Sequence, residues 1–461
     1  VKTLRWVACV ALLVFSVVVM GCSEPAPRPS STRVFLITID TLRADHLGSY
    51  GYPRGVSPFL DSLAERSIVF DNAISASSHT APSHASLFTS LYPAQHQLLQ
   101  NGELLSDDLL TLAEVLRNAG FQTAGFTAVN FLDGLEQGFD QFRTGTVYSP
   151  AEEVLGWAKE WLDEWGPGED VFVWIHLFDV HEWYHDNHLD LEAVEAVSSS
   201  AQPSGDELVA FLSRAHGLVP ERFPGARSIV EVMNNYDGQL LSTDRSLEGF
   251  YNQVGGSRPG QDELWIVTAD HGEGLGNHEF LGHGRFIYNE QLHVPLLIHA
   301  PERFGGATRI SELVRLVDLA PTLAEIVGAS FADQPIPIEG HSLLPLLEGA
   351  SDQLTPGPAV SQRRPADEKR LAENWHPGEV YATQDGHRKL IVSTGGEIEF
   401  FDLDNDPFEL HNGWRHDDDD QNERVRALVE LYLSMKEQGE VIGSGEIAPE
   451  HIEELKALGY L

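Results

Sequence analysis

The sequence predicts an α/β fold in which helices pack on a doubly wound, mainly parallel sheet. Short runs of β-branched and apolar residues alternate along the chain with amphipathic stretches, which is the order expected of β–α–β units. Two of these runs end directly in an acidic residue, Asp40 and Asp270, where open sheets of this class place their sites. With 461 residues, the chain can build one large domain and a smaller second one.

The predicted strands are short and rich in Val, Ile, Leu and Phe, which is typical of strands buried on both faces. In chain order they cover residues 33–40, 68–70, 123–127, 170–177, 263–269 and 292–299. Apolar residues at helical spacing separate them, with Pro58 at one helix start and Gly120 just after a helix end. The predicted helices cover residues 58–66, 82 onward, 109–118, 154–165, 228–254 and 314–327.

Composition divides the chain into further segments. Residues 33–350 form the expected main domain, within which residues 185–227 are polar, irregular and predicted to be an insertion or lid. Residues 351–375 are Pro- and charge-rich and predict a linker. Residues 376–461 predict a small α+β subdomain with strands at 380–383, 389–393 and 398–402 and a helix near 422–437.

Acidic residues dominate the charge: 70 Asp and Glu stand against 30 Lys and Arg, a net charge of −40. Such a chain has no basic stripe with which to release counterions from nucleic acid or an anionic lipid surface, so neither is an expected partner. An anionic substrate must therefore be attracted locally, by a metal ion or a focused pocket.

The N-terminal residues have the pattern of a bacterial lipoprotein signal. Basic residues precede an apolar run over residues 6–20, and Val19-Met20-Gly21-Cys22 resembles a lipobox. We expect residues 1–21 to be removed, Cys22 to carry lipid and residues 22–32 to form a tether. This predicts a periplasmic or cell-surface protein that contacts the membrane only through its anchor. An uncleaved signal anchor is the competing interpretation.

A Ser- and Thr-rich turn leads into a helix at Ser78-His79-Thr80-Ala81-Pro82-Ser83-His84. A proline near the helix start would place Thr80 just ahead of the N-terminus, beside unpaired N–H groups and the positive end of the dipole. That environment suits an alkoxide nucleophile, a metal and an oxyanion. An ordinary helix cap explains the same residues when they are taken alone.

Asp40, Asp270 and His271 follow predicted strands, and Thr80 lies in a turn. If these strand ends share one edge of the sheet, they converge around one divalent cation. Two carboxylates, one imidazole and a hydroxyl suit Ca²⁺, Mn²⁺ or Zn²⁺, and the sequence does not choose among them. Taken singly, an Asp after a strand is equally well explained as a turn or cap residue.

Other histidines follow the strands as well. The glycine-rich loop 270–284 carries His278 and His283, and imidazole binds both metals and anions, so both are expected near the substrate. His181 lies past the end of strand 170–177 and is the expected ligand contact there, whereas His176 lies inside the strand and is expected to be a core residue.

Seven short segments carry a resemblance to a known family. They are IDTLRADHLG (residues 39–48), TAPSH (80–84), FDVH (178–181), TADHGE (268–273), VDLAPTL (317–323), GHSL (340–343) and FDLDNDP (401–407). In order and content they resemble the sulfatase family of the alkaline-phosphatase superfamily. The resemblance implies an alkaline-phosphatase-like mixed, mainly parallel sheet sandwiched by helices, with a small C-terminal α+β subdomain.

The same resemblance implies roles for single residues. Asp40 lies in the first metal segment, and Asp270 with His271 in the second. Thr80 and His84 occupy the first and last places of the C-x-P-S-R nucleophile motif. His181 resembles the substrate histidine, and His283 stands where relatives carry a Lys or His that contacts the anion and the leaving group.

The chain also departs from the family pattern. Sulfatases use a Cys, or sometimes a Ser, oxidised to formylglycine, but the β-carbon of Thr80 carries a methyl group and cannot become an aldehyde. Threonine in this place resembles the superfamily's phosphotransferases and phosphodiesterases. His84 replaces an Arg, Thr41 replaces the second Asp of a pair, and Asn130 is a weaker donor where the family has a Lys and a His.

The resulting hypothesis is a metal-dependent hydrolase of sulfate or phosphate esters, with Thr80 as a nucleophile that favours phosphoryl chemistry. His181 and His283 would steady the anion and protonate the leaving oxygen. The expected substrate-binding residues are His84, Asn130 and His278, and the substrate is an anionic small molecule or glycan. Two alternatives stay open: a transferase of phosphoryl-linked head groups to envelope glycans or lipids, and an inactive surface lipoprotein that binds sulfated or phosphorylated glycans.

Overall fold

The chain folds around a central eight-stranded sheet, with a four-stranded sheet in the C-terminal part. The computed structural model describes residues 31–442 except 166–167, 200–204, 226, 257–260, 351–356, 367–370 and 372–374. The predicted signal peptide and Cys22 lie outside the described residues. Among the helices that are described, none is long and apolar enough to cross a membrane.

The central sheet is mixed and mainly parallel. Its spatial order is β10 (Thr308–Arg315), β2 (Ile68–Ile74), β9 (His293–His299), β6 (Gln261–Thr268), β1 (Ser31–Ile39), β5 (Val171–Leu177), β3 (Gln122–Thr127) and β4 (Gln141–Thr144). Strand β9 runs antiparallel to both of its neighbours, and the other pairs are parallel. Every residue of β5 and β6 is buried, as expected for strands covered on both faces.

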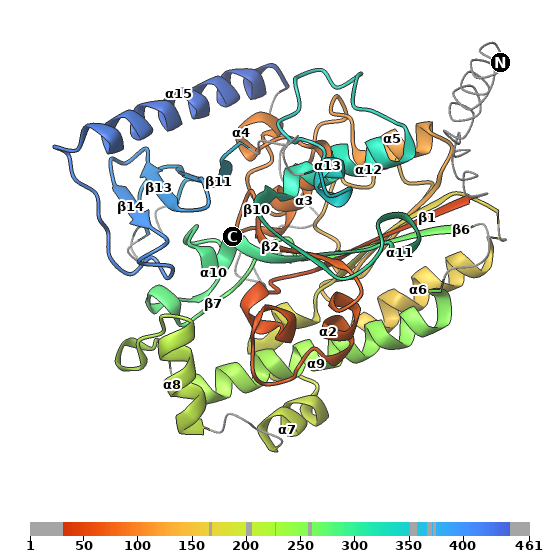
Figure 1. Cartoon of the computed structure of the whole chain (residues 1–461), viewed down its shortest axis with the longest axis horizontal. Coiled ribbons are helices and arrows are strands. Elements are labelled where there is room, and N and C mark those ends of the chain that lie inside the picture. Colours follow the sequence, from red (N-terminus) through yellow and green to blue (C-terminus); the bar gives the residue numbers. More distant parts are fainter. Residues whose placement is uncertain are drawn as a thin grey trace, which may run out of the picture.

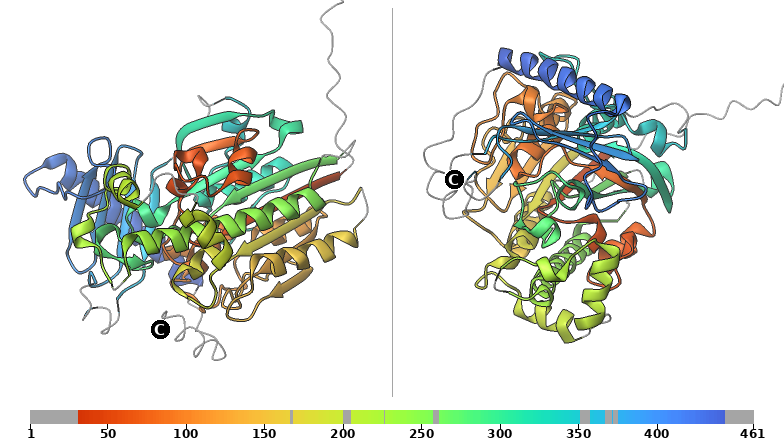
Figure 2. Two further views of the ribbon diagram at one scale, coloured as in Figure 1. Left: turned by 90° about the horizontal axis from the view of Figure 1, so that it is seen from below. Right: turned by 90° about the vertical axis from the view of Figure 1, so that its left-hand side faces the viewer.

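Helices cover both faces of this sheet (Figures 1 and 2). On one side α9 (Ile229–Val254) packs against α6 (Ala151–Asp163) and α2 (Pro58–Ala64). On the other side α3 (Thr80–Thr89) packs against α5 (Leu112–Asn118) and α12 (Leu319–Val327). The predicted fold class is confirmed. The shorter elements are α4 (Pro93–His96), α10 (Asn289–Leu292), α11 (Pro301–Phe304), α13 (Leu344–Leu347), η1 (Ala44–His46), η2 (Gly48–Tyr50), η3 (Asp179–Tyr184), η4 (Pro220–Arg222), η5 (Asn277–Glu279) and η6 (Leu316–Asp318).

The strand directions bring the predicted functional segments to one edge of the sheet. Strands β1, β3, β5 and β6 are parallel, and β2 shares their direction because β9 is antiparallel to both β2 and β6. Their carboxyl ends therefore meet at one edge. The segments that leave these ends contain Asp40, Thr80, Asn130, His181 and Asp270.

The sequence pattern does not predict the two outermost strands. Strand β4 is mostly exposed, so it lacks the apolar run that marks the inner strands. The helix predicted from residue 314 begins only at Leu319, because Val314 and Arg315 complete β10. Helix α3 also begins earlier than expected: His79 is the N-cap, and Thr80 is the first helical residue.

The predicted insertion at 185–227 is helical rather than irregular. Helix α7 (Leu191–Ser199) and helix α8 (Gly205–Ala215) both pack against α9. Each buries only a few apolar side chains, among them Val197 and Leu212, and is polar elsewhere. A helix with so narrow an apolar stripe gives a weak periodic signal.

Two predicted boundaries are corrected by strand pairing. Residues 351–375, expected to be a linker, contain β11 (Ala359–Arg363), which pairs with β12 (Val380–Gln384). Strand β1 begins at Ser31, inside the expected tether 22–32, because Ser31 and Thr32 pair with β6. Both segments look irregular along the chain because their hydrogen-bond partners are distant in sequence.

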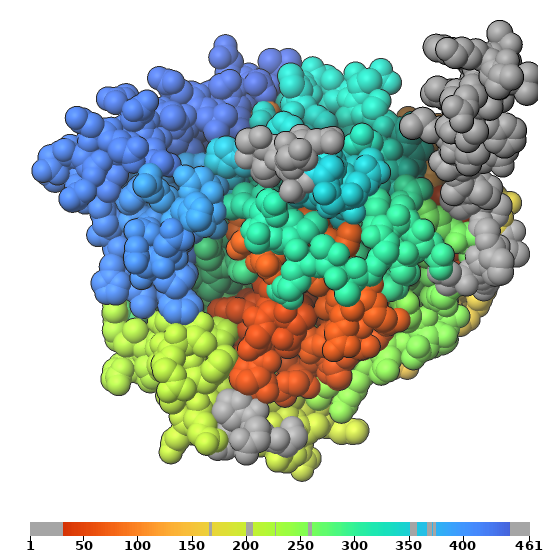
Figure 3. Space-filling model, in the orientation of Figure 1, coloured from red at the N-terminus to blue at the C-terminus, as the bar shows by residue number. Residues whose placement is uncertain are grey.

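The C-terminal subdomain is α+β, as predicted. Its antiparallel sheet has the order β11-β12-β13-β14, with β13 (Arg388–Ser393) and β14 (Ile398–Asp402) completing it. Helix α15 (Asp419–Ile442) packs on β12, β13 and α4. Figure 3 shows the subdomain, in blue, meeting the yellow-green region of α8, and Phe408 lies directly against Gly217 there.

Asp244 links α9 to α2 and makes the stability of the fold depend on pH. Its carboxylate accepts hydrogen bonds from the backbone N–H groups of Phe59 and Leu60, at 2.9 and 2.8 Å. Burial raises the pKa of Asp244 to about 7, so the folded state holds this proton more tightly than the unfolded chain. The contribution is therefore complete below about pH 4 and is lost as pH rises through about 7.

Asp244→Asn is expected to remove this pH-dependent loss of unfolding free energy, which is on the order of 3 kcal/mol between pH 4 and pH 8. Urea unfolding of both proteins over that pH range measures it as the difference in unfolding free energy. A difference that stays constant with pH would show that Asp244 does not titrate in this way.

Candidate active site

Thr80 is held at the first turn of α3, beside the segment that follows β6. Its side chain is fully buried. One turn further on, Ser83 Oγ donates to the carbonyl oxygen of Asp270 at 2.7 Å and also contacts Ser75 Oγ at 2.9 Å. These bonds join α3 to the carboxyl end of β6. As a result, Thr80 Oγ1 lies 3.5 Å from His271 Nε2.

The three residues predicted to bind a metal meet at this point. His271 Nε2 lies 3.3 Å from Asp270 Oδ2 and 4.0 Å from Asp40 Oδ1. One ligand atom from each of the three lies within 4.8 Å of the other two. All three side chains are completely buried. The shared sheet edge therefore assembles a group that no one of its segments contains.

Each carboxylate in this group uses one oxygen for a protein contact. Asp40 Oδ2 lies 3.1 Å from His176 Nε2, and Asp270 Oδ1 accepts from the backbone N–H of Thr41 at 3.3 Å. Within the described residues, Asp40 Oδ1 and Asp270 Oδ2 have no hydrogen-bond partner. His271 Nδ1 donates to the carbonyl oxygen of Gly272 at 2.9 Å, so its Nε2 offers a lone pair to the same place.

Two buried carboxylate oxygens that no donor contacts within the described residues fit a divalent cation. Two buried carboxylates this close cannot both carry charge without a positive partner. Burial and the charge of Asp270 raise the pKa of Asp40 well above its usual range. Burial acts on Asp270 in the same direction, but His271 and His84 hold the pKa of Asp270 below its usual value. A cation bound here would supply the positive partner that the two carboxylates need.

Two backbone features fix the position of the Asp40–Asp270–His271 group. Thr41 has a φ of 57°, in the left-handed region that a β-branched residue seldom adopts. Its carbonyl oxygen accepts from Tyr236 Oη at 2.8 Å while its N–H reaches Asp270. At Gly272, a β-carbon would lie 2.2 Å from the carbonyl oxygen of Glu290, so only glycine fits.

The histidines predicted to act on the leaving group lie next to His271. The ring centre of His283 is 4.6 Å from that of His271 and 5.0 Å from that of His181. Each of the two is oriented by a buried carboxylate: His283 Nδ1 lies 3.3 Å from Glu273 Oε1, and His181 Nδ1 lies 3.0 Å from Glu182 Oε1. Thr80, His271, His283 and His181 thus form one contiguous group.

Protein groups engage both ring nitrogens of His84, whose predicted role is substrate binding, and its Nδ1 lies 3.9 Å from Asp270 Oδ2. Its Nδ1 donates to the carbonyl oxygen of Thr80 at 2.8 Å, since a carbonyl can only accept. Its Nε2 lies 3.0 Å from the hydroxyl of Thr38, which also accepts from Trp174 Nε1. Burial lowers the pKa of His84 to about 3. The ring is therefore neutral and supports Thr80 from the interior, because both nitrogens are already used.

His278 is held by protein groups at both ring nitrogens. Its Nδ1 lies 2.9 Å from Glu290 Oε1, and its Nε2 donates to the carbonyl oxygen of Glu409 at 3.0 Å. The ring stacks on Tyr288 with 3.7 Å between ring centres. Both nitrogens are therefore occupied by protein groups, and the ring forms part of a pocket wall, so its contact with substrate stays a prediction.

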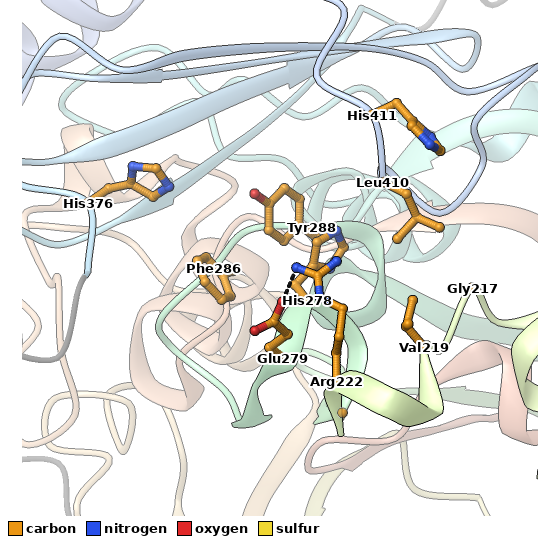
Figure 4. A pocket seen from close by; sticks show the side chains of 11 residues that line it. Gly217, Val219, Arg222, His278, Glu279, Phe286, Tyr288, His376, Leu410 and His411 are labelled. Atoms are coloured by element: carbon orange, nitrogen blue, oxygen red, sulfur yellow. Dashed lines mark ion pairs between the residues drawn. The ribbon is translucent and has the colours of Figure 1, made fainter. Parts of the chain in front are cut away.

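That pocket has a volume of about 410 Å³ (Figure 4). Four parts of the chain form it: residues 217–222, the tip of the hairpin between β7 (Gly274–Leu275) and β8 (Leu281–Gly282), residues 286–288, and the C-terminal subdomain. Its lining residues are Gly217, Val219, Arg222, Gly276, His278, Glu279, Phe286, Tyr288, His376, Leu410 and His411.

Asn130, the third residue predicted to bind substrate, follows β3 at the edge that carries Thr80. Its side-chain carbonyl oxygen is buried and has no hydrogen-bond partner within the described residues. Its contact with an anion stays a prediction.

The structure adds three residues that the sequence pattern does not assign to the site. His176, expected in the core, is buried but contacts Asp40, because the register of β1 and β5 pairs it with Thr38. Glu182 and Glu273 orient His181 and His283. Each acid lies within two residues of a predicted site histidine, His181 or His271, and that adjacency is the signal that could have identified them.

The chain is similar to known sulfatases and their relatives. The sulfatase family model matches residues 32–329. An ulvan-active sulfatase of Formosa agariphila is 22% identical over 447 aligned residues, which cover 87% of this chain and 79% of the relative. The multifunctional alkaline phosphatase superfamily protein PehA of Trinickia caryophylli is 25% identical, covering 82% of this chain and 90% of its own.

A solved structure has the same fold. The phosphonate monoester hydrolase of Agrobacterium radiobacter superposes with a TM-score of 0.67 at 21% identity, covering 89% of this chain and 96% of its own. The family model spans well over half of the chain and includes Asp40, Thr80, His181, Asp270 and His283. The chain therefore belongs to the sulfatase family of ester hydrolases.

Proposed function

We propose that this chain is a metal-dependent hydrolase that uses Thr80 as its nucleophile and favours phosphate esters over sulfate esters. The observation that carries the proposal is the position of Thr80 Oγ1, 3.5 Å from His271 Nε2, a nitrogen that itself lies 3.3 Å from Asp270 Oδ2 and 4.0 Å from Asp40 Oδ1. A buried hydroxyl beside a buried, acceptor-only ligand group is the arrangement that an activated alcohol nucleophile needs.

Asp40, Asp270 and His271 would hold the cation. When bound, a divalent cation lowers the pKa of a neighbouring hydroxyl and polarises a non-bridging oxygen of the ester. Carboxylate oxygens with one imidazole nitrogen admit Ca²⁺, Mn²⁺ or Zn²⁺.

The chain's own residues account for the bonds made and broken. Thr80 releases its proton to solvent and attacks phosphorus, the bond from phosphorus to the leaving oxygen breaks, and an imidazolium protonates that oxygen. Water then attacks phosphorus, the Oγ–P bond breaks, and Thr80 regains a proton. His181 suits the acid role: burial alone would lower its pKa, but Glu182 and Asp40 raise it above the usual value.

Two features of the site favour phosphorus over sulfur. The methyl group on the β-carbon of Thr80 prevents oxidation to an aldehyde, whose hydrate would expel sulfate without help from water. His84 is neutral and turned into the interior, so it supplies no charge to clamp a sulfate group. A phosphonate monoester hydrolase with this fold is consistent with a phosphorus ester at the site.

The leaving group is proposed to extend toward the pocket shown in Figure 4. The base of the β7–β8 hairpin carries Glu273 and His283, and its tip carries His278 and Glu279 in the pocket wall. Aromatic, histidine and arginine side chains suit an aryl group or a sugar ring. We further propose that the protein acts outside the cytoplasm, tethered by lipid at Cys22, on the strength of residues 1–22 alone.

A substrate panel on the purified full chain tests this proposal. Aryl sulfate, phosphate monoester and phosphodiester substrates are each assayed with Ca²⁺, Mn²⁺ or Zn²⁺. We expect turnover of a phosphate ester to exceed that of aryl sulfate by at least about tenfold in kcat/KM. Turnover of sulfate alone contradicts the phosphoryl preference, and background rates throughout contradict the enzyme assignment. A phosphorylated Thr80 that accumulates until an alcohol or glycan acceptor is added would identify a transferase.

A further inference from the structure

A second group of metal-binding side chains lies on η3 and the turn after it. Glu182 is in η3, and its carboxylate is almost fully buried, with 1% of the side chain exposed. Its Oε2 contacts the Nδ1 atoms of His185, at 2.8 Å, and His188. One ligand atom from each of these three residues lies within 4.8 Å of the other two.

The local backbone explains why these residues converge. A 3₁₀ helix has three residues per turn, so side chains at positions i and i+3 lie over one another. Glu182 and His185 stand in that relation at the end of η3, and His188 follows three residues later. The backbone N–H of His188 donates to the carbonyl oxygen of His185 at 2.8 Å, which continues the tight turn.

Neighbouring side chains hold this group in place. The ring of His188 stacks on Tyr148 with 4.8 Å between ring centres, and that of His185 lies 4.2 Å from Tyr184. Glu182 Oε1 is engaged by His181 Nδ1 at 3.0 Å, which leaves Oε2 as the oxygen on the side of His185 and His188. Such outer contacts commonly orient the ligands of a metal.

Burial and access also fit a cation. The buried Glu182 carboxylate lies against three imidazoles, those of His181, His185 and His188. His185 and His188 are 32% and 36% exposed. A cation in solution can therefore reach their nitrogens without any rearrangement of the core.

We propose that Glu182, His185 and His188 form a second divalent cation site, separate from the Asp40–Asp270–His271 group and selective for Zn²⁺-like ions. Two imidazoles with one carboxylate are a ligand set that Zn²⁺ accepts, whereas Ca²⁺ and Mg²⁺ prefer oxygen ligands. The two groups share no residue, so each can fill independently. The inference does not depend on Thr80 acting as a nucleophile.

Metal counting tests the second site. The full chain is stripped with chelator, dialysed against Zn²⁺, and its bound metal is measured by elemental analysis against protein concentration. We expect the His185→Gln/His188→Gln variant to bind one ion fewer than the wild type, and an Asp270→Asn variant also to bind one fewer. Combining all three substitutions should remove two. Because the two histidines are partly exposed, the variant is expected to fold, and circular dichroism checks this.

His387→Gln is the matched control, since His387 pairs with Asp404 at 3.0 Å on a different, exposed surface. It should leave the metal count unchanged. Co²⁺ substitution gives a second readout: visible absorption from the Glu182 group should persist in Asp270→Asn and vanish in the double variant. An unchanged ion count in His185→Gln/His188→Gln would overturn the proposal. Ester turnover plays no part in these measurements, so failure of the proposed function leaves them interpretable.

Discussion

Thr80→Val is expected to lower kcat by at least about 10³-fold while leaving the fold intact. Valine keeps the branched shape of the side chain in the fully buried first turn of α3 but removes Oγ1, the atom 3.5 Å from His271 Nε2. Without that oxygen no covalent intermediate forms, and the remaining residues can only bind substrate. Steady-state kinetics on the best substrate of the panel measures the loss of kcat. Intact mass spectrometry of the quenched reaction measures the loss of the covalent intermediate.

Two further variants separate chemistry from structure. Thr80→Ser keeps the hydroxyl and should retain measurable turnover. Ser83→Ala removes the hydrogen bond to the carbonyl oxygen of Asp270 one turn away, so it should cost stability more than activity. Wild-type kcat in Thr80→Val would rule out Thr80 as the nucleophile, and loss of activity in Ser83→Ala alone would point to α3 as a positioning element.

Asp270→Asn is expected to abolish cation binding at the active site together with activity, again by at least about 10³-fold. In the His185→Gln/His188→Gln background, where the second proposed site is absent, a cation at about a hundred times its Kd should stabilise the protein by about 2.7 kcal/mol. Adding Asp270→Asn should remove that stabilisation. Thermal unfolding with and without the cation measures it.

The same substitution is expected to destabilise the chelator-treated protein slightly, because the lowered pKa of Asp270 shows that its surroundings favour the charged carboxylate. The amide oxygen of the introduced asparagine would still accept from Thr41 N–H, while the like-charge repulsion with Asp40 disappears. Asp244→Asn is the matched control, because Asp244 is also a buried acid but lies on α9, away from the group. A cation-induced shift that survives Asp270→Asn, or is lost in Asp244→Asn, would contradict the assigned ligands.

Much of the site could be predicted from local pattern. Asp40 and Asp270 each end an apolar run, and an open α/β sheet presents such ends at one edge. Thr80 precedes a proline at a helix start, and the order of the motifs identified the family. These patterns involve residues close together in the chain, so they can be recognised in a single sequence without knowing which strands pair.

The side-chain environments could not be predicted in the same way. His84 and His176 are the same residue type, yet His84 donates to the backbone carbonyl of Thr80 and His176 contacts Asp40. That difference follows from the β1–β5 register and from the direction in which α3 crosses the sheet. The strand inside the expected linker escaped prediction for the same reason, since β11 is defined by its partner β12.

By itself, the sequence determined the fold class, the family and the residue types available for catalysis, because apolar periodicity and motif order are properties of neighbouring residues. Only the tertiary structure decided which histidine lies beside Thr80, which buried carboxylate oxygens have no hydrogen-bond partner within the described residues, and that Glu182 contacts three imidazoles. Most of those outcomes depend on contacts between distant segments, such as that of Thr41 with Asp270, 229 residues away. Because these groups are buried, water cannot replace a lost partner, and each contact therefore contributes to the geometry of the site.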